Sequence, residues 1–224
     1  MRRPRICIAG LDAESGTHIR PVSRGAFELT RSLTTMGGGT LGLGARIDFG
    51  EMIPDPTPPE VEDQIFESDR IRFVNFMKPD DYLSLIDDVC LDVLGQVFGP
   101  ELERDGNTYS VAEDGGAASL GCVRVSKASR PEVLVNDYGR VKFRMETADG
   151  RCTVAVTDIR FFELDQNTPK LDVVEFVQRR LKRRVPLRLM VGLSHPWSAD
   201  GENRRHWLQV NGICLEDAPL GDVP

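Results

Sequence analysis

The densest group of chemically active side chains consists of six cations within the ten positions 179–188, with no acidic residue among them: Arg179, Arg180, Lys182, Arg183, Arg184 and Arg188. Guanidinium and ammonium groups in such a group bind phosphates through charge-assisted hydrogen bonds. The alternative is a helix C-terminus, where each cation complements the helix dipole by about 0.3–1 kcal/mol. Two cations would satisfy the dipole, whereas five repel one another, so the excess predicts a partner of opposite charge.

A second candidate surrounds Arg20 in the run Ile19-Arg20-Pro21-Val22-Ser23. Successive side chains of a strand point to opposite faces, so Arg20 faces away from Ile19. If Ile19 is in the core, Arg20 is displayed for phosphate binding, close in sequence to His18, Ser23 and Arg24. The alternative is an ion pair between Arg20 and an acidic residue of segment 48–69. Trp207 alternates with Leu208, and a displayed tryptophan offers a surface on which a base can stack.

No catalytic group is expected. Residues 37–42 match the pattern G-x-G-x-x-G, but a loop precedes them and a strand follows, whereas a dinucleotide site needs a strand and then a helix. No serine lies in a G-x-S-x-G elbow. The acidic groups at 60–69 and 80–92 have the pattern of a linker and of a solvated helix face. The sequence therefore predicts no enzyme, no metal site and no cofactor.

The elements that position these residues follow from the apolar periodicity. Strands are predicted at 5–11, 17–23, 45–53, 70–77, 120–126, 132–136, 140–147, 152–163, 187–193 and 206–215. Expected inward positions are Ala45, Ile47, Phe49 and Met52 in one strand, and Ile71, Phe73 and Phe76 in another. Asp149-Gly150 predicts a two-residue hairpin turn. Helical spacing continues to Phe98 after a start at Pro79, and a second helix is expected over 169–184 with Thr168 as N-cap.

The second half reads as about three strands, a helix and two strands, which is the order of an OB-fold, a five-stranded Greek-key barrel. The first half has a similar but less clear order. We therefore expect a mainly β protein with two helices, built from two tandem OB-like five-stranded barrels at residues 1–118 and 119–224. A single α+β domain is the alternative.

With these elements placed, the chain resembles the prokaryotic dual OB-containing domain family. The resemblance is carried by Ile6–Ala9, Ile19–Ser23, Arg46–Ile53, Glu60–Gln64, Val156–Asp158, Leu189–Ser194 and Trp207–Cys214. It implies a small protein that binds nucleic acid and belongs to a prokaryotic defence system as a sensor or accessory component. His18 stands where family members often carry an aromatic residue.

Charge and cysteine content suggest partners and location. The net charge is −7, segment 48–114 carries −14, and the remainder therefore carries +7. A basic surface can thus meet a polyanion, with single-stranded nucleic acid favoured. The alternative is a protein-interaction adaptor or homo-oligomer that uses the acidic centre and the basic C-terminal helix.

Five scattered cysteines without a CxxC motif predict reduced core thiols. No apolar run reaches the roughly 20 residues of a membrane helix, and the apolar N-terminal stretch is too short for a signal peptide, so we expect a cytoplasmic protein.

Overall fold

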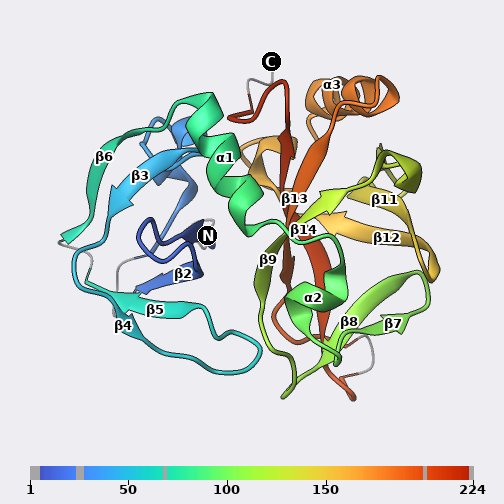
Figure 1. Ribbon diagram of the computed structural model, residues 1–224, viewed down its shortest axis with the longest axis horizontal. Coiled ribbons are helices and arrows are strands. Elements are labelled where there is room, and N and C mark those ends of the chain that lie inside the picture. Colours follow the sequence, from blue (N-terminus) through green and yellow to red (C-terminus); the bar gives the residue numbers. More distant parts are fainter. Residues whose placement is uncertain (1–5, 24–27, 68–69, 199–200, 222–224) are drawn as a thin grey trace.

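Short strands separated by turns build the first third of the chain. The computed structural model describes residues 6–23, 28–67, 70–198 and 201–221 (Figure 1). One sheet has the order β1-β2-β5-β4, with bounds β1 Gly10–Leu11, β2 His18–Ser23, β4 Ile53–Pro54 and β5 Asp63–Phe66, and β2 runs parallel to β5. β3 (Ala45–Asp48) and β6 (Arg72–Phe76) form a separate antiparallel ribbon. Single-turn 3-10 helices, η1 (Arg31–Leu33) and η2 (Thr35–Gly37), fill part of the glycine-rich segment between β2 and β3.

The described chain contains three α-helices rather than the two predicted: α1 (Pro79–Val89), α2 (Leu94–Phe98) and α3 (Leu171–Lys182). The expected helix starts at Pro79 as predicted but stops at Val89. Beyond it, the Leu91 amide donates to the Cys122 carbonyl and the Leu91 carbonyl accepts from the Arg124 amide. The backbone at Leu91 therefore pairs with the strand that contains residues 122–124, and α2 begins only after this pairing. Lys170, not Thr168, precedes α3, because the Thr168 hydroxyl donates to Asp165 instead.

The larger sheet occupies the second half of the chain. Its strands are β9 (Leu120–Val125), β10 (Glu132–Val135), β11 (Val141–Thr147), β12 (Gly150–Val156), β13 (Leu187–Leu193) and β14 (Arg205–Leu215), in the order β10-β11-β12-β14-β13-β9. β12 and β14 are parallel, and α3 lies between β12 and β13 in the chain, as the predicted order of elements requires. η4 (Lys127–Ser129) separates β9 from β10, and η5 (Ile159–Phe161) follows β12.

Neither sheet closes into a barrel among the described residues. β9 and β10 are the two ends of the larger sheet, and no pairing joins them. The hairpin of β7 (Glu103–Asp105) and β8 (Thr108–Ala112) pairs with β14, so this sheet also takes up strands that precede residue 119. The remaining strands of the first half are divided between two further sheets, because β6 pairs with β3 alone. The strand pairing therefore does not show two closed five-stranded barrels. The domain boundary between residues 118 and 119 stays a prediction.

Three apolar clusters stabilise the fold. The largest lies under the larger sheet and includes Phe143, Leu189 and Val210, against which α3 packs Val173, Val174, Val177 and Leu181. The smallest joins Leu29, Phe49 and Phe66 in the first half. Between them, α1 buries Tyr82 and Ile86 beside Cys90, Cys122 and Cys214, and so connects the two halves across the middle of Figure 1.

The cysteines differ from the prediction of five buried, reduced thiols. Cys90 and Cys122 form a disulfide, because the end of α1 places Cys90 against β9 with the two Cα atoms 4.6 Å apart. Cys7 is exposed, whereas Cys152 and Cys214 are buried and free. Burial raises the pKa of each of these two thiols to about 11. None of the helices in the described ranges is long and apolar enough to cross a membrane.

Candidate functional site

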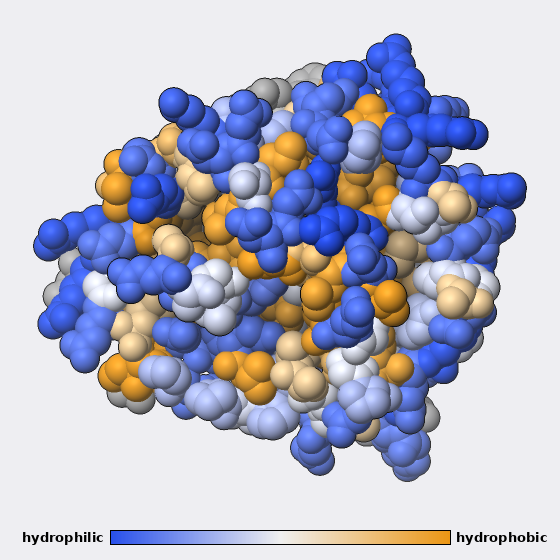
Figure 2. Space-filling model, viewed as in Figure 1, coloured by the Kyte–Doolittle hydropathy of each residue, from blue (hydrophilic) through white to orange (hydrophobic). Residues whose placement is uncertain are grey.

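The end of α3 carries a group of exposed cations, here called the basic ridge: Arg179, Lys182, Arg183 and Arg184. Within the described part of the chain, none of the four has an acidic partner within ion-pair distance. The buried residues Val173, Val177 and Leu181 repeat every four positions, which turns Arg179 and Lys182 toward solvent. Figure 2 shows hydrophilic side chains at the upper right, where Figure 1 places this helix.

Arg180 belongs to the same run but has a structural role. Its guanidinium lies 3.0 Å from the Asp217 carboxylate and 4.9 Å from the centre of the Phe176 ring. At the other side of the helix, the Gln178 amide oxygen accepts a hydrogen bond from the Val133 backbone amide. These contacts fix α3 to β10 and to the segment after β14, and so hold the ridge in place.

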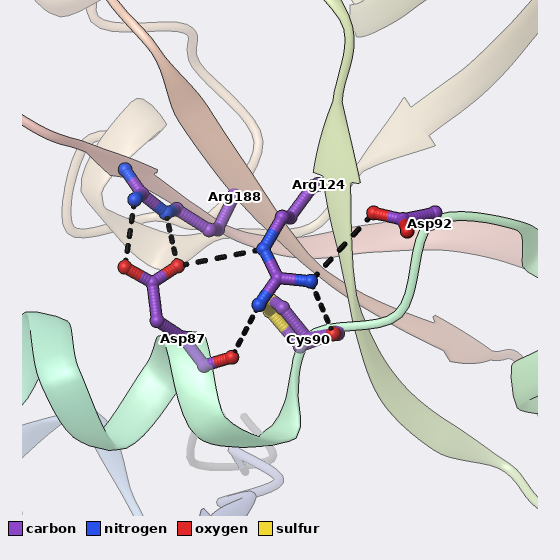
Figure 3. The surroundings of a disulfide bond; sticks show 6 residues. Asp87, Cys90, Asp92, Arg124 and Arg188 are labelled. Atoms are coloured by element: carbon purple, nitrogen blue, oxygen red, sulfur yellow. Dashed lines mark hydrogen bonds and ion pairs between the residues drawn. A yellow bond between two sulfur atoms is a disulfide. The ribbon is translucent and has the colours of Figure 1, made fainter.

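Arg188, the sixth predicted cation, is buried in β13. Two of its nitrogens donate to the two oxygens of Asp87 at 2.8 and 2.7 Å (Figure 3). A third nitrogen donates to Glu216 at 3.1 Å. Burial by itself would lower the pKa of Arg188, but the hydrogen bonds to both carboxylates raise it above its usual value. The structure therefore separates Arg188 from the ridge and gives its donors to the protein itself.

Arg20 adopts the ion-paired alternative. Its side chain is only 13% exposed, its Nε donates to Asp63 at 2.5 Å, and a terminal nitrogen lies 3.2 Å from Glu60. The cause is the parallel pairing of β2 with β5, which puts Asp63 directly opposite Arg20. β5 lies in a segment that the sequence suggested was a linker. The expected display of Arg20 is therefore wrong.

The neighbours of Arg20 have different surroundings. His18 is partly buried, and burial lowers its pKa although the Glu62 carboxylate acts in the opposite direction. The Ser23 hydroxyl is buried and has no hydrogen-bond partner among the described residues. Arg24 lies outside the described residues. The structure thus does not join the β2 residues and the end of α3 into one cluster.

Exposed aromatic rings occur at two places. Trp207 is partly buried, and its indole nitrogen donates to the Trp197 carbonyl at 2.9 Å, while Trp197 itself is 60% exposed. On the β3–β6 ribbon, Phe73 and Phe76 are 41% and 49% exposed with ring centres 4.9 Å apart. The sequence assigned both phenylalanines to the core, because alternation alone cannot show that the ribbon lacks a covering layer. Their exposure is a feature that the sequence analysis missed.

A groove with a volume of about 450 Å³ lies between the two halves. His18 and Gln64 line it from β2 and β5, and Gln96 lines it from α2. Glu62, also at the groove, is buried and accepts hydrogen bonds from the Ser119 amide, the Ser119 hydroxyl and the Leu120 amide at 2.7–3.2 Å. Glu62 therefore ties β5 to the start of β9. The described residues contain no group of three or more His, Cys, Asp or Glu side chains that could hold a metal ion.

The larger sheet and the position of α3 before its last two strands make the protein mainly β, with an order of elements in its second half that is similar to an OB-fold. A family model described as the dual OB-containing domain matches residues 1–213, and the chain belongs to this family. The family supports two OB-like units, although the described sheets remain open. No curated protein and no solved structure matches the chain.

Proposed function

We propose that this protein binds single-stranded nucleic acid and catalyses no reaction, with the basic ridge holding the phosphate backbone. One observation carries the proposal: four neighbouring cations have no acidic partner in the described chain, whereas nearby Arg180 and Arg188 are both ion-paired. Like charges this close repel one another, and a strand of phosphates removes the repulsion. Membership of an OB-containing family supports the same class of ligand.

The expected binding energy is mainly electrostatic. Each phosphate of a single strand that a cation neutralises contributes a slope of about −0.7 to the dependence of log affinity on log salt. If all four ridge cations take part, affinity falls about 50-fold between 50 and 200 mM salt.

The preference for single strands rests on the aromatic surfaces. Phe73, Phe76 and Trp197 are rings with exposed faces, and bases stack on such rings only when a complementary strand does not cover them. The proposal thus assigns backbone contacts to the ridge and base contacts to aromatic side chains.

The test is fluorescence anisotropy with labelled single-stranded DNA, single-stranded RNA and duplex at 50 and 200 mM salt. The ridge variant carries Arg179→Gln, Lys182→Gln, Arg183→Gln and Arg184→Gln. Its matched control changes four other exposed cations, and thus the net charge, by the same amount: Lys78→Gln, Lys127→Gln, Arg130→Gln and Arg140→Gln. Salt-sensitive binding that the ridge variant loses and the control keeps supports the proposal. No binding of any polymer by tens of micromolar protein at 50 mM salt overturns it.

A second candidate function is supported by the charge asymmetry of the chain. Segment 48–114 carries −14 and the rest +7, so the ridge also fits an acidic protein face or a second copy of this chain. Salt-sensitive self-association in sedimentation experiments, without binding to nucleic acid, would favour this adaptor function. The role in prokaryotic defence that the resemblance implies stays a prediction.

A further inference from the structure

The groove between the two halves has apolar side chains in its lining. They are Val61, which precedes β5, Leu120 of β9, and three residues of the α1–α2 region, Val89, Leu91 and Val97. Figure 2 shows hydrophobic side chains gathered in the middle of this face, where Figure 1 places α1, α2 and β9. Val61 and Leu91 are partly exposed although both are apolar. A volume of about 450 Å³ falls in the range of about 300–1,000 Å³ that is typical of small-molecule sites.

The edges of the groove carry polar groups that the protein does not use. Gln64, Gln96 and the His18 ring line the groove, and within the described residues none of these three side chains makes a hydrogen bond. A carboxamide offers donors and an acceptor side by side, which is the pattern that pairs with the edge of a base. The Glu62 carboxylate, in contrast, is already engaged by Ser119 and Leu120.

The charges of the residues that line the groove restrict the class of ligand that can bind there. Among the described residues no lysine or arginine lines the groove, and the one carboxylate there, Glu62, is negative, so a phosphate would be repelled. A purely apolar ligand would cover the amides and leave them without hydrogen-bond partners, which is unfavourable. A flat, uncharged ring with donors and acceptors at its edge satisfies both the walls and the amides.

We propose that this groove holds a nucleobase, supplied either by a free nucleoside or by an unstacked base of a bound strand. The second source rests on the proposed function, whereas the first does not. In both cases the apolar walls contact the faces of the ring, and Gln64 and Gln96 contact its edge.

The first experiment measures binding of uncharged ribonucleosides to the full chain by saturation-transfer NMR and calorimetry. The variant Gln64→Leu/Gln96→Leu removes the edge contacts and is expected to weaken binding by about tenfold or more. The ridge variant serves as the control, because its groove is intact and its nucleoside affinity is expected to equal that of the natural chain. Circular dichroism of each variant checks that the fold is retained.

The second experiment uses a single strand that contains 2-aminopurine, whose fluorescence rises when the base leaves its stack. If the fluorescence of 2-aminopurine rises with the natural chain but not with Gln64→Leu/Gln96→Leu, the groove takes a base from a bound strand. If nucleosides bind in the first experiment, the groove takes the free ligand. If neither nucleosides nor the 2-aminopurine strand responds in a Gln-dependent way, the groove proposal is wrong. Ridge-dependent binding of the strand in that case leaves the proposed function standing.

Discussion

Arg184 and Arg188 are four residues apart in the sequence but have opposite surroundings. The basic ridge ends at Arg184 and projects from α3 without acidic partners in the described chain. Four residues later, Arg188 belongs to what we call the Asp87 junction, which consists of Asp87, Arg124, Arg188 and Glu216. Figure 3 shows the first three of these residues beside the Cys90–Cys122 disulfide. The difference is whether a distant segment supplies a carboxylate, and here α1 supplies it only to the junction.

The comparison teaches that paired arginines stabilise the fold and unpaired ones are available for a ligand. Asp87 lies 101 residues before Arg188, so their pairing exists only after α1 has packed on the sheet. Substitutions in the two groups are therefore expected to have different effects on stability and on binding.

The disulfide beside the junction is expected to contribute most. Cys90 and Cys122 are 32 residues apart, and closing a loop of this length restricts the unfolded chain by about 3–4 kcal/mol. The variant Cys90→Ser/Cys122→Ser is therefore expected to lose that amount in urea unfolding followed by tryptophan fluorescence. Cys7→Ser, at an exposed position, is the control and should change stability by less than about 0.5 kcal/mol. Titration of five thiols rather than three in unfolded, unreduced protein would contradict the disulfide.

Removal of Arg188 is expected to have the next largest effect. Arg188→Met leaves Asp87 and Glu216 without their shared cation, and breaking a fully buried pair costs about 3–5 kcal/mol. Both carboxylates are partly exposed, which reduces the expected loss to about 2 kcal/mol. Affinity for single-stranded nucleic acid should stay unchanged, and an affinity loss with unaltered stability would invalidate the division between ridge and junction.

Arg124 is expected to matter less because its side chain is 44% exposed. It donates to the backbone carbonyls of Asp87 and Cys90 at 2.5 and 2.8 Å, and so closes the C-terminal end of α1. Arg124→Gln should lower stability by about 0.5–1 kcal/mol. Hydrogen exchange is expected to accelerate in the last turn of α1, with Arg151→Gln, an exposed ion-paired arginine on β12, as the comparison.

The ridge variant itself should change stability least. Loss of favourable dipole interactions at the end of α3 is offset by relief of repulsion between Arg179 and Arg183, each about 0.2–1 kcal/mol. We expect a net change within about 0.5 kcal/mol in urea unfolding, together with loss of nucleic-acid binding. A destabilisation as large as that of Arg188→Met would show that the ridge has structural partners.

Local patterns were enough to predict the elements but not their partners. The helix expected over 169–184 is present as α3, two residues shorter at each end, and the strand at 187–193 was predicted to the residue. The hairpin near Asp149 is confirmed, although Ala148-Asp149 form the turn and Gly150, with φ 104°, opens β12. These features depend on neighbours in the chain.

The features that the sequence missed depend on contacts between distant segments. Asp63 looked like part of a linker until β5 paired with β2, and that pairing converts Arg20 from a displayed side chain into an ion-paired one. Cys90 meets Cys122 only because α1 crosses β9. For the candidate site, the cations of the ridge could be found from composition, whereas the groove needs both halves in place and has no local pattern.

The position of β14 in the larger sheet has a consequence for how the protein folds. β12 and β13 are joined only through β14, which also pairs with β8, yet β14 is the last strand of the described chain. During synthesis on a ribosome, every other strand of this sheet emerges before β14. Until β14 is available, β10–β11–β12 and β9–β13 can form only as two separate groups of paired strands. The centre of the sheet therefore assembles late and through pairings of long sequence separation, which makes folding slow and leaves strand edges unprotected until synthesis has passed Leu215.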